Sequence, residues 1–111
     1  MSQQRLYVAN AFSLGMLTSK ETYLMVKEVD IETAKSMLKG GFISAIGHQS
    51  TAQLLSALLG VDISFNRLPI KLQKGDKVLV FQLLTRLEEG RILSDEELRQ
   101  LQYKFFVVEV L

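Results

Sequence analysis

His48 is the side chain of this sequence best suited to acid–base chemistry near neutral pH, because imidazole changes charge in that range. It is the only histidine among 111 residues and stands in the run Gly47-His48-Gln49-Ser50-Thr51. Glycine lets a backbone approach a ligand closely. Ser50 and Thr51 begin a predicted helix, whose free N–H groups suit a phosphate oxygen. The run favours a proton donor acting on a phosphodiester; an ordinary turn before a helix is the alternative.

Two further polar segments follow predicted strands, where loops collect ligand sites in sheet proteins. Asn10 and Ser13 offer hydrogen bonds to a base, a ribose or a phosphate, although such residues also mark plain turns. Gln82 interrupts the apolar run 78–84 and shares a strand face with valines. We therefore expect a buried amide there, which needs a structural partner or a ligand.

Charged side chains add candidates for binding an anion. Arg67 and Arg86 can clamp a phosphate because guanidinium presents two donors side by side, although isolated arginines are usually solvated. Glu88 and Glu89 are adjacent, so in a strand they point to opposite faces and do not form a catalytic pair. Either one can pair with Arg86 or orient a ribose hydroxyl; a solvated surface charge is the alternative.

These side chains need a scaffold, and the sequence predicts one in which strands and helices alternate. We expect strands at 6–9, 22–29, 42–46, 78–84 and 105–110, the last one central in the sheet. Asp30 begins a helix that Gly40-Gly41 ends, and capping boxes Ser50–Gln53 and Ser94–Glu97 begin two more, ending near 59 and 102. The expected fold is α/β (α+β): a mixed β-sheet packed with short helices, in a single domain over residues 1–111.

Composition excludes several classes of protein. Thirteen Lys and Arg against 12 Asp and Glu give a net charge of +1, which argues against a duplex nucleic acid partner and allows a small anion. The absence of Cys and the single His exclude disulfides and thiolate metal sites, so no metal or cofactor is expected. No apolar run is long enough for a membrane helix or a signal peptide. We expect a soluble protein, most simply cytoplasmic.

Three motifs stand in order along nearly the whole chain. They are Asn10-Ala11-Phe12-Ser13, the segment 45–51 with its Gly-His-x-Ser-Thr element, and Arg86-Leu87-Glu88-Glu89-Gly90 followed by Leu93-Ser94-Asp95. Together they resemble the viral ring nuclease family. Its members are small anti-CRISPR proteins, with bacterial and mobile-element relatives, that destroy cyclic tetra-adenylate and so switch off type III CRISPR signalling. The second and third motifs are specific when found together.

The resemblance implies a homodimer that holds cyclic tetra-adenylate across its two-fold axis and cleaves it without a metal. A ribose 2′-hydroxyl attacks the neighbouring phosphate, which leaves linear di-adenylates with 2′,3′-cyclic phosphate ends. His48 matches the general acid, and Glu89 matches the catalytic glutamate, with Glu88 as its alternative. Positions that match substrate-binding residues, together with the loop glycine, are Asn10, Ser13, Gly47, Ser50, Thr51, Arg67, Gln82 and Arg86. Gly15 stands where some relatives carry an asparagine, so no ligand contact is assigned there.

Two other functions are compatible with the same residues. The first is a module that binds or sequesters a cyclic nucleotide without cleaving it. The second is a small regulatory interaction protein of a mobile element, in which the His-Ser-Thr turn is only the start of a helix. In a virus- or mobile-element-encoded protein, the compartment would be the host cytoplasm.

Overall fold

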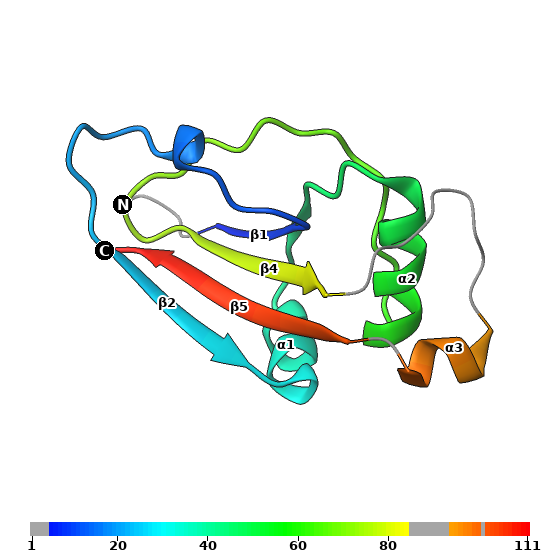
Figure 1. The fold of residues 1–111 in the computed structure, drawn as a ribbon. Coiled ribbons are helices and arrows are strands. Elements are labelled where there is room, and N and C mark those ends of the chain that lie inside the picture. Colours follow the sequence, from blue (N-terminus) through cyan, green and yellow to red (C-terminus); the bar gives the residue numbers. More distant parts are fainter. Residues whose placement is uncertain (1–4, 85–93, 101) are drawn as a thin grey trace.

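A five-stranded mixed sheet forms the centre of the computed structural model (Figure 1), which describes residues 5–84, 94–100 and 102–111. Its elements are β1 (Leu6–Ala9), the 3-10 helix η1 (Leu14–Met16), β2 (Leu24–Val29), α1 (Ile31–Leu38), β3 (Ile43–Ser44), α2 (Gln49–Leu59), β4 (Lys77–Leu83), α3 (Asp95–Gln100) and β5 (Tyr103–Val110). The strand order is β2-β5-β4-β1-β3. β1 pairs in parallel with β3 and β4, whereas β5 is antiparallel to β2 and β4. The predicted α+β fold is confirmed.

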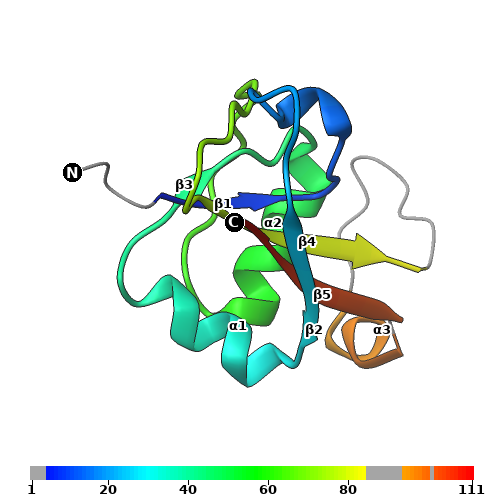
Figure 2. The same cartoon turned by 90° about the vertical axis from the view of Figure 1, so that its left-hand side faces the viewer.

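Both faces of the sheet are buried along β1, β4 and β5, because each face is covered by a different kind of structure (Figure 2). Helices α1 and α2 cover one face, where the buried cluster includes Val8, Leu55, Leu79, Phe81 and Phe105. The long segments around η1 and between α2 and β4 cover the other face, where the cluster comprises Tyr7, Ala9, Ile70, Leu72, Val78, Val80, Val108 and Val110. Alternate residues of one strand therefore enter two separate cores, which explains why β4 and β5 are apolar almost throughout.

The ends of α1, α2 and α3 follow from local chemistry. Asp30 accepts a hydrogen bond from the Thr33 N–H at 2.8 Å, and α1 spans the residues predicted for it. Gly60 ends α2 with a φ of 69°, a conformation that glycine adopts without strain. The Ser94 hydroxyl lies 3.2 Å from the Glu97 N–H that it accepts, as in the predicted capping box. In the described part of the chain, no helix is long and apolar enough to cross a membrane.

Two predictions of local structure were wrong, and the bounds of β2, β4, β5 and α3 differ by one or two residues from those predicted. Ser50 is not the N-cap that was predicted: α2 begins at Gln49, and its N-cap is His48, whose side chain makes no capping hydrogen bond. The predicted buried strand 42–46 is reduced to the edge strand β3, whose Ile43 is exposed. Pairing with β1 extends to Ser44 only, since the chain there must leave the sheet to enter α2. β2 begins at Leu24, two residues later than expected.

A buried carboxylate, Asp76, closes the end of the sheet where β1 and β4 begin. Its oxygens accept hydrogen bonds from the Arg5 N–H at 3.1 Å, from Arg5 Nη2 at 2.9 Å and from the Gln73 N–H at 2.9 Å. The side chain of Asp76 is 1% exposed, whereas that of Arg5 is 40% exposed. Next to this cluster, the Lys77 N–H donates to the Arg5 carbonyl at 2.8 Å. Asp76 therefore helps to set the register of β1 against β4.

The pKa of Asp76 lies below its ordinary value because two effects act in opposite directions. Burial raises it, but hydrogen bonds from the Arg5 side chain and from the Gln73 and Arg5 N–H groups lower it more. The folded state thus binds this proton more weakly than the unfolded chain does. The stabilisation is complete above the unfolded pKa of about 4 and is lost as pH falls through the folded value.

We expect Asp76→Asn to lower the free energy of unfolding at pH 7 by about 2 kcal/mol, because buried donors lose their charged acceptor. The difference from wild type should shrink below about pH 4. Urea unfolding followed by circular dichroism across this pH range measures both effects. Glu28→Gln is the matched control, because it removes an exposed ion pair with Lys104 at 3.6 Å and should cost less than about 1 kcal/mol. Equal losses in the two variants would contradict the role of Asp76.

Candidate functional site

A pocket of about 440 Å³ opens where the chain leaves β1 and β3. Because these strands are parallel neighbours in the sheet, their carboxyl ends lie at the same edge, and the loops that follow them meet there. The lining residues are Ala9, Asn10, Ala11, Met16, Ala45, Gly47, His48, Arg67, Leu68, Pro69 and Ile70. They come from the loop after β1, the loop after β3 and the segment that follows α2. Among them are one permanent cation and no carboxylate, which favours an anionic ligand.

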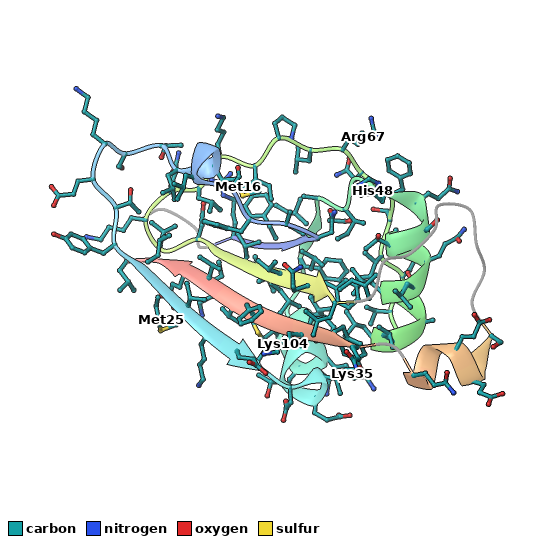
Figure 3. The ribbon with its side chains drawn as sticks, in the orientation of Figure 1. Met16, Met25, Lys35, His48, Arg67 and Lys104 are labelled. Carbon is teal, nitrogen blue, oxygen red and sulfur yellow. The ribbon has the colours of Figure 1, made fainter. Side chains whose placement is uncertain are left out.

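His48 is exposed and belongs to the lining of this pocket. Its backbone is the N-cap of α2, with the extended angles φ −130° and ψ 126°, and its carbonyl accepts the Ala52 N–H at 3.0 Å. Figure 3 labels His48 and Arg67 near the start of α2, and both residues line the pocket. The site therefore places an imidazole, a guanidinium and a helix N-terminus at one pocket, and together these groups suit a phosphate.

Asn10 and Arg67 both contact the peptide of Gly47, directly before His48. The Gly47 N–H donates to Asn10 Oδ1 at 3.4 Å, and Arg67 Nε donates to the Gly47 carbonyl at 3.3 Å. The Arg67 guanidinium also lies over the Phe65 ring, 5.9 Å from its centroid. These contacts hold Arg67 at the pocket. The bond to Gly47 uses Nε, so the two terminal nitrogens of the guanidinium take no part in it. The structure thus brings Asn10, Gly47, His48 and Arg67 together at one pocket.

Other predicted site residues lie outside the pocket lining. Ser13 is exposed at the start of η1, where its side chain caps nothing. Ser50 and Thr51 occupy the first turn of α2; Ser50 is buried, and Thr51 is partly buried. They are therefore close in sequence to His48 but do not line the cavity. Arg86, Glu88 and Glu89 lie outside the described residues.

The prediction that Gln82 is buried was wrong, since its side chain is exposed. The pairing register explains why. The last residue of β1, Ala9, lies opposite Val80, so Gln82 is two residues beyond the end of that neighbouring strand. Its remaining partner is Lys104 of β5. The alternation of side chains along β4 was predicted correctly, but the length of the strand beside it was not visible in the sequence.

The apolar side chains of the pocket were not predicted from the sequence. Ala45, Leu68, Pro69 and Ile70 line the pocket together with Met16, which Figure 3 shows above the sheet. Such side chains look like ordinary core in a sequence, and the one available hint is Leu68-Pro69, an extended pair directly after Arg67. Within the described ranges, no cluster of three or more His, Asp or Glu side chains is placed to hold a metal ion.

Comparison with known proteins assigns the chain to a family. A family model described as STIV B116-like matches residues 6–105. The chain belongs to the STIV B116-like family. B116 of Sulfolobus turreted icosahedral virus is similar in structure, with a TM-score of 0.84 and 35% sequence identity over 95% of this chain and 98% of that protein.

Proteins similar to this chain occur in viruses and in a bacterium. Protein 26 of Sulfolobus islandicus filamentous virus is 43% identical over 107 residues, which cover 95% of this chain and 91% of the relative. The ORF116 protein of Acidianus filamentous virus 1 is 32% identical, with 86% and 83% covered. YddF of Bacillus subtilis is 31% identical, with 88% and 94% covered. The similarity therefore extends over nearly the full length of each chain.

Two glycines test whether the pocket loop depends on backbone strain. Gly47 lacks a positive φ, and a Cβ there would lie 3.7 Å from Arg67 Cγ, an ordinary contact. We expect the free energy of unfolding of Gly47→Ala to equal that of wild type or to be slightly higher. In Gly60→Ala the free energy of unfolding should fall by about 1 kcal/mol, because φ is positive at this position. No atom lies within 4 Å of the added Cβ, so the loss would come from backbone strain alone. Thermal unfolding distinguishes them, and a large loss in Gly47→Ala would show that this loop is strained.

Proposed function

We propose that this member of the STIV B116-like family is a ring nuclease that cleaves cyclic tetra-adenylate to linear di-adenylates with 2′,3′-cyclic phosphate ends. The observation that carries the proposal is the position of His48: an exposed imidazole at the N-cap of α2, in a pocket shared with Asn10 and Arg67. The motifs that resemble viral ring nucleases contribute two of the three loops around that pocket. The activity would switch off type III CRISPR signalling.

The proposed reaction uses a nucleophile that belongs to the substrate. A ribose 2′-oxygen forms a bond to the adjacent phosphorus while the bond from phosphorus to the 5′-oxygen breaks. The protonated imidazole of His48 gives its proton to the departing 5′-oxygen, and the 2′-hydroxyl proton passes to a base or to water. The other contributions of the protein are alignment and stabilisation of charge on the phosphate. Arg67 and the N-terminus of α2 are placed for the second task.

The composition of the pocket supports a nucleotide as the ligand. Arg67, Asn10 and His48 offer polar groups for phosphate and ribose, whereas Ala11, Met16 and their apolar neighbours offer a surface for a base. The volume of about 440 Å³ falls within the range of about 300–1,000 Å³ for a drug-sized ligand. It suits one nucleotide better than a ring of four.

This difference in size supports a homodimer as the active form. Two copies related by a two-fold axis would present two pockets and two His48 side chains to one ring. A ring of four identical nucleotides shares that symmetry, so each copy could cut one of two opposite bonds. A di-adenylate is then the natural product.

His48→Ala should lower the single-turnover rate by about 10² to 10⁴, the usual contribution of a general acid. The test incubates cyclic tetra-adenylate with protein and EDTA, and separates the products by liquid chromatography and mass spectrometry. Ring binding, measured by isothermal titration calorimetry, should change by no more than a few fold. Gln53→Ala is the matched control, since Gln53 is exposed on the same helix and does not line the pocket.

Each other outcome identifies a different function. An intact ring with tight binding by wild type would replace the nuclease with a sequestering module. The absence of binding at micromolar concentration would favour a regulatory interaction protein. Loss of binding and turnover together in His48→Ala would overturn the assignment of His48 as the acid.

A further inference from the structure

We propose that Asn66 is a positioning residue for His48, which it holds in place through the backbone of the segment Ser44–Gly47. This role rests on the proposed function, in which His48 donates the proton. Asn66 is exposed and does not line the pocket. Its effect on catalysis would therefore come through the chain that leads to His48 and through no contact with the ligand.

Asn66 bonds twice to that segment. Its side-chain Nδ2 donates to the Ser44 carbonyl at 2.7 Å, and its own N–H donates to the Ile46 carbonyl at 2.9 Å. In the other direction, Ser44 Oγ donates to the Ser64 carbonyl at 2.6 Å. A parallel bridge joins Ile46 to Phe65. Residues Ser64–Asn66, which follow α2, thus lie alongside Ser44–Gly47 and form a short additional ribbon next to β3.

The opposite side of Ser44–Gly47 is bonded to β1 and the loop after it. The Ala45 N–H donates to the Val8 carbonyl at 2.8 Å, and the Gly47 N–H donates to Asn10. The segment Ser44–Gly47 is therefore hydrogen-bonded on both sides, and it ends at the residue directly before His48. On the far side of His48, the first turn of α2 begins. The imidazole is exposed, so the backbone on each side is what fixes its position.

Asn66 is the member of this network whose side chain can be changed with the least effect on the pocket. Asn10 and Arg67 also contact Gly47, but both line the cavity, so their replacement would alter ligand contacts as well. The bond from Asn66 to Ser44 ends on a buried residue. Loss of its donor leaves that carbonyl without the amide and removes one of the three hydrogen bonds between the ribbon and the segment, so that the segment can shift. A shift of about 1 Å in a catalytic group can cost about a hundredfold in rate.

The test compares Asn66→Ala and the uncharged, similarly sized Asn66→Leu with Ser64→Ala. Both Asn66 variants remove the Nδ2 donor. Ser64→Ala is the matched control, because Ser64 takes part in the ribbon through its main-chain carbonyl alone. We expect kcat on cyclic tetra-adenylate to fall at least tenfold in the Asn66 variants, with KM and the dissociation constant unchanged within about twofold. Ser64→Ala should keep the wild-type kcat.

A second measurement needs no substrate. In the free protein, ¹H–¹⁵N spectra should show shifts of the Gly47 amide, the His48 amide and the imidazole ring in both Asn66 variants but not in Ser64→Ala. Should one Asn66 variant fail to fold, the other gives the same comparison. Unchanged kcat in a folded Asn66 variant, or equal losses of kcat and binding, would overturn the positioning role. If wild type leaves the ring intact, the proposed function fails, while the spectra still decide whether Asn66 positions His48.

Discussion

Parallel pairing of β1 with both of its neighbours is the constraint on which the site depends. Tyr7 lies opposite Ile43 of β3 on one side and Val78 of β4 on the other. With β1 fixed between them, the chain must leave β1 and β3 at the same edge. Asn10 and Gly47 then lie close enough for a hydrogen bond, although 37 residues separate them. An antiparallel partner in place of β3 would send its loop to the opposite edge of the sheet, away from Asn10.

The charge arrangement at the opposite end of the sheet supports the same pairing. β1 has only four residues, so few ladder bonds define its register against β4. Asp76 adds to them by binding both the backbone and the side chain of Arg5. A shift of one residue would break these bonds and would also move Tyr7 and Val8 to the wrong faces. The molecule thus has a fixed end at Arg5 and Asp76, and an open end at His48 and Arg67.

Local patterns predicted most of the fold, because they depend on neighbours in sequence. The first turn of α1 and the cap of α3 follow from side chains three residues apart. The start of α2 was wrong because Ser50, despite its capping-box spacing, lies within the helix, where His48 takes the N-cap position. The same holds for the candidate site. Sequence motifs identified His48 and Asn10, whereas the contacts of Phe65 and Asn66 depend on pairing between the loop after β3 and the segment after α2. Nothing in a single sequence marks that pairing.

The openness of the pocket is consistent with chemistry in which the substrate supplies part of the machinery. His48 is exposed while the peptides beside it are held, so its position comes from the backbone and not from enclosure of its ring. A site of this kind excludes water only when a bound ligand shields it from solvent. A cyclic tetra-nucleotide with four bases is large enough to do so. When the nucleophile is the ligand's own 2′-hydroxyl, the protein needs to provide alignment, one proton and a cation. In the proposed homodimer, His48 and Arg67 of each copy would supply the proton and one cation from this edge of the sheet.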